Sequence, residues 1–352
     1  MKRIASLLYF CLLALFSFAQ GGYLVFNSIE HQFGDVPEDG GQIQHTFEFT
    51  NKGTAPVIIY SVATSCGCTA TEWSQEPILP GKKGNVTAIF QPAGRPYSFS
   101  KTLTVHTNAQ PEKQVLTIRG FVIPQNASKE ELYTQRLGAV SLRNYYQLLG
   151  NVSHLEKQKI EIPVFNSSDK PQEVTLSPLP VALSGKTKLK LKPGEIKHFE
   201  LELNPQKLEE WGQQSLEIVL KCGDATGRYY VHLSRVEDFS KLSLKEREKA
   251  ARLELSSTRY TFPKTKAGTL VEQSIELRNV GASPLIVRKV ITNSIQITYT
   301  LDKQEIPAGE TGILTLRFDT KGSYGEQLRH IQLVVNDPHE TMPFFQWEGT
   351  LE

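Results

Sequence analysis

The sequence predicts an all-β protein of three tandem immunoglobulin-like β-sandwich domains, joined by short, partly helical linkers. Short strands of alternating apolar and polar residues recur along the chain, with Gly, Pro and Asn turns between them. Asn51, Asn166 and Asn279 each end such a strand and open a turn that leads through a proline into the next strand. Their spacing of roughly 115 residues is the length of one small domain.

The first 19 residues predict a secretory signal peptide. Lys2 and Arg3 precede an apolar run over residues 4–18, and small residues lie before the expected cleavage point after Ala19. The alternative is a retained membrane anchor. No other run approaches the roughly 18 apolar residues of a membrane span, so no transmembrane segment is expected after cleavage. We expect an exported protein, in the periplasm or at the cell surface of a bacterium.

The domain boundaries follow from flanking motifs that repeat with the Asn turns. Phe33-Gly34-Asp35-Val36 has a counterpart in Leu149-Gly150-Asn151-Val152, and turns of the Pro-Gly type follow each repeat, as in Pro80-Gly81. The expected order is signal peptide 1–19, domain one 20–124, linker 125–137, domain two 138–236, helical linker 237–252 and domain three 253–352.

Two connecting segments interrupt the β pattern. Residues 128–137 are polar and predict a short helical turn. Residues 242–253 are rich in helix-forming residues, and Ser243 lies where an N-cap is expected. We interpret both as solvated linkers, with a partner-binding helix as the alternative for the second.

The charge balance argues against a nucleic-acid partner. Without Lys2 and Arg3, the 39 basic residues of the chain fall to the number of its 37 acidic ones. A neutral chain lacks the excess of positive charge that binds phosphate backbones. The common hydrolase, phosphate-binding and zinc-protease motifs are also absent from the sequence. We therefore expect no enzyme activity and no cofactor.

Two further patterns have structural explanations. The segment Asp337-Pro338-His339-Glu340 looks like an acid–base cluster, but it occupies the position of a hairpin turn in the first repeat. The alternating lysines of residues 186–192 are typical of a solvated face or a protected edge strand.

The first repeat resembles the bacterial domain of unknown function 1573 family. The resemblance is carried by Phe33–Val36, His45–Asn51, Ser65–Thr69 and Pro77–Gly81, and it covers roughly residues 26–122. Repeats two and three look like diverged relatives that lack the cysteine pair. The resemblance implies an immunoglobulin-like domain related to Hydin-type modules, found in envelope proteins, and it implies no established activity.

Cys66-Gly67-Cys68 is the one candidate for chemistry beyond scaffolding. Assigning Cys11 to the signal peptide leaves Cys66, Cys68 and Cys222, an odd number in an oxidising compartment. Cysteines two apart on an extended segment point to the same side, so both sulfurs can meet one ligand or each other. Cys222 ends an apolar strand and is interpreted as a buried structural thiol.

Three interpretations of Cys66 and Cys68 remain open. The pair can be structural, either as small apolar groups or as a tight local disulfide of little stabilising effect. It can exchange with a partner thiol, although no flanking base or cation lowers its pKa. It can bind copper(I) or zinc, with His45 and His106 as the two further ligands of a zinc site, although their spacing is not that of a metal motif.

We therefore predict an exported, non-catalytic protein of the cell envelope that acts as a binding or scaffolding module for an unidentified protein partner. The alternative is a thiol-dependent envelope protein, redox-active or metal-binding, that uses Cys66 and Cys68. A third possibility, an assembly chaperone that donates or accepts strands, lacks a basic anchor and an unpaired donor strand in the sequence.

Overall fold

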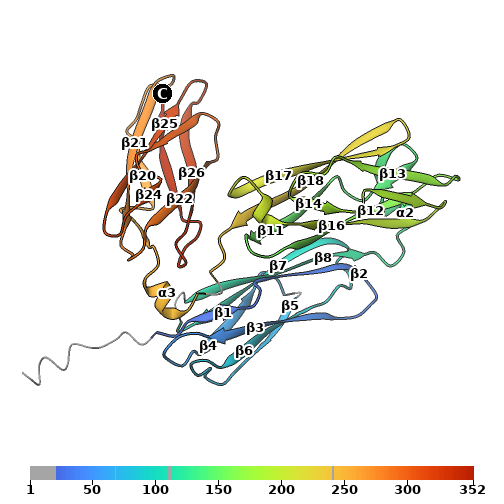
Figure 1. Cartoon of the computed structure of the whole chain (residues 1–352), viewed down its shortest axis with the longest axis horizontal. Helices are drawn as coiled ribbons and strands as arrows, with labels where there is room; N and C mark the ends of the chain where they lie inside the picture. Colours follow the sequence, from blue (N-terminus) through green and yellow to red (C-terminus); the bar gives the residue numbers. More distant parts are fainter. Residues whose placement is uncertain (1–20, 68, 110–111, 240–241) are drawn as a thin grey trace, which may run out of the picture. The chain divides into compact units, whose positions relative to one another are not determined.

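The computed structural model describes residues 21–67, 69–109, 112–239 and 242–352, and the predicted signal peptide and Cys68 therefore lie outside the described residues. Over the described part the chain is almost entirely β-structure, with helix confined to two short α-helices and one 3-10 turn (Figure 1). Six sheets, each of four or five strands, pair into three sandwiches. Each sandwich has its own hydrophobic core, as the sequence predicts.

The first sandwich packs the sheet β1-β3-β6-β5 against the sheet β2-β8-β7-β4. Side chains from both sheets are completely or almost completely buried between them: Phe47, Phe49 and Phe90 from one sheet, and Leu103 and Ile118 from the other. The strands are β1 (Leu24–Phe26), β2 (Glu30–Pro37), β3 (Ile43–Asn51), β4 (Ile59–Thr64), β5 (Thr69–Trp73), β6 (Lys83–Phe90), β7 (Tyr97–Thr107) and β8 (Lys113–Ile123).

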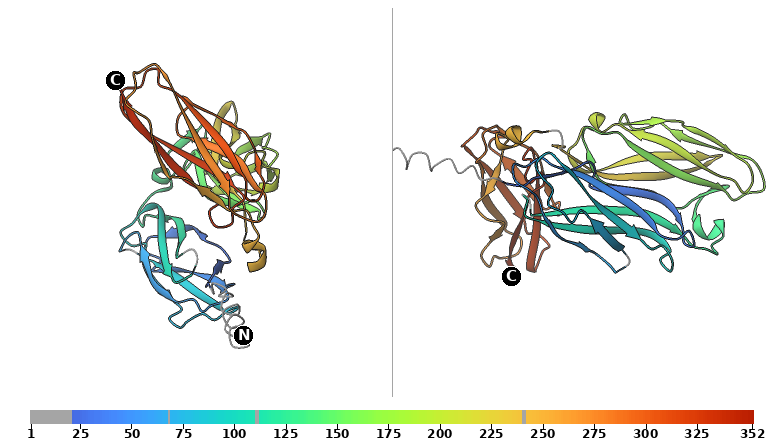
Figure 2. Two further views of the ribbon diagram at one scale, coloured as in Figure 1. Left: turned by 90° about the vertical axis from the view of Figure 1, so that its left-hand side faces the viewer. Right: turned by 90° about the horizontal axis from the view of Figure 1, so that it is seen from below.

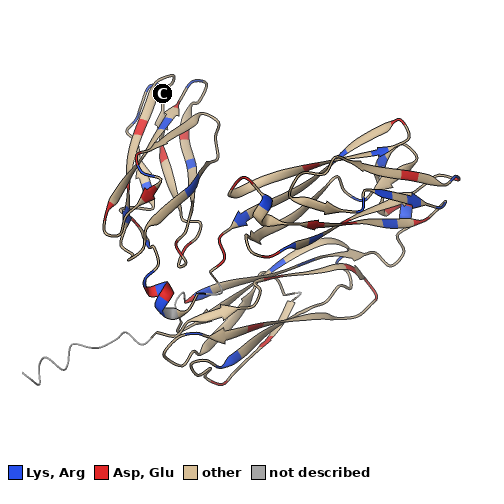
Figure 3. Ribbon diagram, in the orientation of Figure 1, with Lys and Arg blue, Asp and Glu red and all other residues tan. Residues whose placement is uncertain are grey.

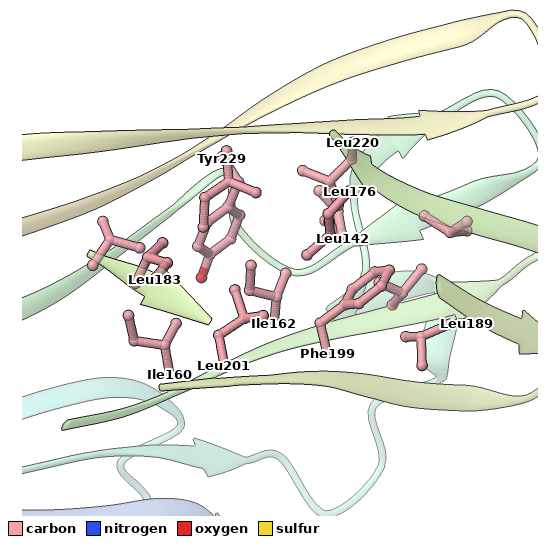
Figure 4. Close-up of a cluster of buried hydrophobic side chains, with 14 of the residues drawn as sticks. Leu142, Ile160, Ile162, Leu176, Leu183, Leu189, Phe199, Leu201, Leu220 and Tyr229 are labelled. Carbon is pink, nitrogen blue, oxygen red and sulfur yellow. The ribbon is translucent and has the colours of Figure 1, made fainter. Parts of the chain in front are cut away.

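The second sandwich packs the sheet β14-β16-β12-β10-β9 against the sheet β11-β18-β17-β13-β15. Figure 4 shows its core, in which Phe199, Ile162 and Leu201 face Tyr229 and Leu220. The strands are β9 (Gln135–Leu137), β10 (Val140–Leu142), β11 (Tyr146–Ser153), β12 (Gln158–Asn166), β13 (Gln172–Ser177), β14 (Leu183–Gly185), β15 (Lys188–Leu191), β16 (Ile196–Leu203), β17 (Gly212–Cys222) and β18 (Ala225–Val236); η2 (Pro205–Lys207) is the 3-10 turn.

The third sandwich packs the sheet β19-β21-β25-β23 against the sheet β20-β27-β26-β22-β24. Trp347, Phe318 and Phe345 fill its centre. Figure 2 shows the layers of the three sandwiches from two further directions. The strands are β19 (Leu253–Leu255), β20 (Arg259–Thr261), β21 (Leu270–Asn279), β22 (Leu285–Thr292), β23 (Ile297–Leu301), β24 (Glu305–Ile306), β25 (Thr311–Asp319), β26 (Gly325–Val335) and β27 (Phe344–Leu351).

The repeated asparagines form the same hydrogen-bond network in all three sandwiches. Each side chain is completely buried. In the first sandwich, Asn51 Nδ2 donates to the carbonyls of Ala55 (2.9 Å) and Ile78 (2.7 Å), and Oδ1 accepts from Gly53 N (2.8 Å). Asn166 and Asn279 make the equivalent bonds at distances between 2.8 and 3.2 Å. The asparagine joins the turn to the neighbouring sheet edge, which explains why the repeat is centred on it.

The repeated glycine motifs also have a common structural role. The early strand of each sandwich runs parallel to its last strand, as β2 to β8 and β11 to β18, and in each of these two pairs the register shifts at the motif. Gly34 (φ 71°) and Gly150 (φ 73°) take up the shift in the left-handed region. Glycine adopts this conformation without the penalty of a Cβ atom.

The two helices lie in the linkers, where the sequence predicts them. The helices α2 (Lys129–Leu132) and α3 (Leu244–Glu248) each begin with a complete capping box, formed by Ser128 with Glu131 and by Ser243 with Glu246. The predicted linker 125–137 is too long at its C-terminal end. Residues Gln135–Leu137 form β9 and pair with β10, because Leu137 is buried in the core of the second sandwich.

The described residues divide into two compact units at residue 128, and the second unit contains the second and third sandwiches. Within it, the Trp211 ring contacts the guanidinium groups of Arg235 (4.1 Å) from its own sandwich and Arg288 (4.6 Å) from the third. Glu237 accepts two hydrogen bonds from Arg288, at 3.0 and 2.9 Å. Lys289 and Glu210 pair at 2.8 Å beside them. These contacts join the second and third sandwiches.

Basic and acidic residues are interspersed on the strands of all three sandwiches (Figure 3). None of the helices in the described part of the chain has the length and apolarity needed to cross a membrane.

Candidate functional site

Cys66 lies in the loop by which the first sandwich changes sheets. The chain leaves β4, an edge strand of one sheet, and enters β5, an edge strand of the other. Ser65 fixes the loop at its start: its backbone N–H donates to Thr102 O (3.0 Å), and its hydroxyl accepts from Thr102 N (3.1 Å). The Thr64 hydroxyl donates to Cys66 O (2.9 Å). The backbone is thus held in place directly before the cysteine motif.

The sulfur of Cys66 is engaged in a disulfide bond. Its side chain is half-buried, with Sγ lying 3.7 Å from the Thr69 hydroxyl. Gly67 is exposed, and a Cβ added there would meet nothing within 4 Å. Cys68 lies outside the described residues. Thiol exchange at this site requires that an attacking thiolate reach one sulfur of the disulfide.

The two histidines that the sequence offers as metal ligands differ in their surroundings. The His45 ring stacks on His31, with a centroid distance of 3.6 Å and an interplanar angle of 5°. Burial lowers the pKa of both rings, and for His31 the nearby His45 lowers it further. His106 lies on β7 opposite Lys113. Across the described ranges, no three His, Cys, Asp or Glu side chains are grouped so that they could hold a metal ion.

Cys222 ends β17 and is buried, as the sequence predicts, with a free thiol. Its Sγ donates to Gln172 Oε1 at 3.7 Å. It belongs to the core cluster of the second sandwich. Its role there is packing.

The segment Asp337–Glu340 is a structural turn. Asp337 is buried, and its carboxylate accepts from Leu253 N and from His339 N, each at 2.8 Å. It thereby ties the hairpin between β26 and β27 to β19. Burial, followed by the Asp337 charge, raises the pKa of Glu340. The alternating lysines likewise lie where expected, since β15 is an edge strand with exposed Lys188 and Lys190.

The second sandwich carries an aromatic surface that the sequence analysis missed. Tyr146 and Leu148 on β11 lie in register with Tyr230 and His232 on β18. The rings contact one another: Tyr145 with Tyr146 at 5.4 Å, Tyr146 with His232 at 6.0 Å and Tyr230 with His232 at 6.1 Å. Tyr145, Tyr146 and Leu148 are among the exposed large hydrophobic residues. We call these five residues the tyrosine face.

A signal for the tyrosine face exists in the sequence. In β18, buried Tyr229, Val231 and Leu233 alternate with outward-facing Tyr230 and His232. Alternation predicts polar residues at the outward positions of a solvated sheet, so aromatic rings there are the anomaly that marks the surface. The tyrosine face continues on β11 because β11 pairs in parallel with β18. The residues of these two strands lie far apart in the sequence.

Solved structures include several distant matches to the chain. The chain resembles a protein of unknown function from Porphyromonas gingivalis W83, with 22% identity and a TM-score of 0.47, over 61% of this chain and 100% of that one. It also resembles the CupB2 chaperone of Pseudomonas aeruginosa, with 9% identity and a TM-score of 0.23, over 58% and 98%. A PapD-like domain of human CEP192 matches with 15% identity and a TM-score of 0.23, over 30% and 87%.

No curated protein matches the chain. The model of the family described as "Protein of unknown function (DUF1573)" matches residues 24–122 and 253–345, which are the first and third sandwiches. The sequence resemblance rests on motifs of the first sandwich. The third sandwich also matches the family model, although it lacks the cysteine motif. The two matches together span more than half of the chain, which therefore belongs to the DUF1573 family.

Proposed function

We propose that this protein is an exported, non-catalytic binding and scaffolding module of the bacterial cell envelope, and that the tyrosine face contacts a protein partner. The observation that supports this is the connected set of aromatic side chains on an open sheet surface. Tyrosine combines a large apolar ring with a hydrogen-bonding hydroxyl, and tyrosines are enriched among the residues that dominate protein–protein binding.

The setting of the tyrosine face favours a protein ligand. Tyr230 lies opposite Glu217 in the sheet, and Glu217 pairs with Arg228 at 3.4 Å, so polar groups border the rings. An aromatic centre with a charged rim is the usual composition of a protein interface. The surface stands on paired strands with a packed core beneath it, so little ordering entropy is lost on binding.

Alanine substitution of the face tests the proposal. The mature chain, immobilised and exposed to an envelope extract of the producing cells, is expected to retain a discrete partner. Tyr146→Ala with Tyr230→Ala is expected to weaken retention at least about tenfold. Tyr299→Ala removes an exposed tyrosine from the third sandwich and is the matched control. Equal retention by all variants would contradict a role for the tyrosine face.

The export part of the proposal has its own measurement. The intact mass of protein recovered from the producing bacterium is expected to correspond to a chain that begins at Gln20. A chain that retains residues 1–19 would contradict signal cleavage after Ala19 and would favour the anchor.

A second candidate function is thiol exchange at the cysteine motif, and the disulfide bond of the partly buried Cys66, in the loop between two edge strands, favours it. In such a step, a partner thiolate attacks one sulfur of the disulfide, a mixed disulfide forms and the other sulfur leaves as a thiolate. Intact mass after mild reduction and alkylation tests it. Two newly alkylated thiols at low reductant concentration would support exchange, whereas a bond that persists until the chain unfolds would leave the motif structural.

A further inference from the structure

The interface between the second and third sandwiches has two parts, a loop and a strand. The loop precedes β17 and carries Trp211, followed by Gly212 at φ 72°. The strand is β22, whose register with β26 shifts between Val287 and Lys289 and leaves Arg288 as the bulged residue. Trp211 lies on Arg288, and a Cβ at Gly212 would come within 2.8 Å of Ile291. Glycine therefore permits the loop to approach the strand closely.

Each sandwich contains an equivalent of this loop, at the start of β7, β17 and β26. The first residue of the strand has positive φ in all three: Tyr97 (78°), Gly212 (72°) and Gly325 (68°). The preceding residue is Pro96, Trp211 and Tyr324, respectively. The loop of the third sandwich thus repeats the aromatic–glycine pair of the second. Tyr324 is 74% exposed, and a Cβ at Gly325 would meet nothing within 4 Å.

The loop of Tyr324 is hydrogen-bonded to a neighbouring loop that carries an exposed apolar residue. Ser323 donates to Gln296 Oε1 (3.3 Å), and Gln296 Nε2 donates to Lys321 O (2.7 Å), so this loop is bonded to the loop between β22 and β23. That second loop displays Ile295, which is fully exposed. Tyr324 and Ile295 are thus exposed apolar residues on two loops that are bonded to each other.

Each sandwich also contains an equivalent of the strand β22, namely β4, β13 and β22 itself. The register of β4 with β7 shifts between Ile59 and Ser61, which leaves Tyr60 at the position of Arg288. β13 pairs with β17 without a shift. Of the two bulged strands among the described residues, β22 has its bulged residue Arg288 covered by Trp211. The bulged residue of β4, Tyr60, is exposed. Tyr60 is 63% exposed, and Ile58 nearby is exposed as well.

We propose that the Tyr324 loop of one molecule docks on the bulged strand β4 of a second copy of this chain, with Tyr324 against Tyr60. This repeats between molecules the loop-on-strand contact that the second and third sandwiches make within one. It deepens the proposed scaffolding role and rests on it.

The residues that flank the two tyrosines are compatible with the contact. In the internal interface Glu210 pairs with Lys289. The equivalent positions beside Tyr324 and Tyr60 are Ser323 and Ser61. These two positions therefore bring no unpaired charge into the contact. Two tyrosine rings replace the Trp211–Arg288 pair as an aromatic contact.

A contact between two different surfaces of the same molecule is heterologous, so it builds rings or open head-to-tail chains. Sedimentation of the full mature chain over a concentration series tests it, with an increase in average mass as the expected result. Tyr324→Asp and Tyr60→Asp should each weaken association at least about tenfold. Tyr60→Arg should retain it, because arginine reproduces the Arg288 contact. Val181→Asp, at an exposed loop residue of the second sandwich, is the control.

Mixing the two aspartate variants gives the sharpest result. Each variant keeps one intact surface, so the mixture should form a one-to-one dimer and no larger species. A wild-type chain that stays monomeric, association that survives either aspartate substitution, or a mixture that stays monomeric would overturn the proposal. Circular dichroism confirms that each variant is folded. If the chain does not self-associate but a partner still binds at the tyrosine face, only the self-association is refuted and the proposed function stands.

Discussion

The completely buried asparagines determine how each sandwich is closed at its repeated turn. Asn51 bonds the carbonyls of Ala55 and Ile78 and the amides of Gly53 and Tyr23, and its bonds to Ile78 and Gly53 are buried. Asn51→Ala is expected to destabilise the first sandwich by roughly 3 kcal/mol or more, because several buried polar groups lose their partners together. Hydrogen-exchange protection of peptides from this sandwich measures the change. Asn27→Ala, at an exposed asparagine, should stay within about 0.5 kcal/mol of the wild type.

The stacked histidines His31 and His45 make the first sandwich sensitive to acid. Their pKa values lie below the ordinary 6.5, because burial disfavours the charged rings and because His45 repels a charge on His31. The unfolded chain therefore binds more protons than the folded chain, and stability falls as the pH drops below about 6.5. We expect the urea midpoint to fall between pH 7.5 and pH 5. His31→Gln should reduce that fall, and an unchanged pH dependence would contradict the assignment.

At the scale of elements, Tyr97 shows how one repeat departs from the others. It begins β7 in the left-handed conformation that Gly212 and Gly325 adopt at the same position. This conformation costs a non-glycine residue roughly 1–2 kcal/mol. Glycine avoids that cost but loses more conformational entropy on folding, which offsets part of the difference. Tyr97→Gly is therefore expected to be roughly 0.5–1 kcal/mol more stable than Tyr97→Ala. Equal denaturation midpoints for the two variants would show that the backbone is unstrained.

The elements themselves were largely predictable from the sequence. Alternating strands, the Asn turns and the capping serines Ser128 and Ser243 act locally, so short patterns specify them. The tyrosine face was not predicted, because it depends on the parallel pairing of β11 with β18. The Trp211 contact depends in the same way on residues of two sandwiches. That Cys66 and Cys68 form a thiol or disulfide site with a chemical role stays a prediction.

For the whole molecule, Trp211 links the second and third sandwiches. Trp211→Ala removes the ring that contacts both Arg235 and Arg288, and it is expected to free the linker around α3. Trypsin should then cleave at Lys245 or Lys249 roughly tenfold faster, because local opening exposes the backbone. The Tyr299→Ala variant should be cleaved at the wild-type rate. If trypsin cleaves Trp211→Ala at the wild-type rate, other contacts suffice to hold the second and third sandwiches together.

Photo-crosslinking in the producing cells tests the central claim most directly, that the second sandwich binds a protein partner through the tyrosine face. A photo-reactive phenylalanine analogue replaces Leu148 in that face or, as a control, Val181 in an exposed loop of the same sandwich. We predict a discrete crosslinked species from position 148 that is absent at position 181 and is lost when Tyr146→Ala and Tyr230→Ala are added. No discrete species from position 148, or the same species from both positions, would contradict the account.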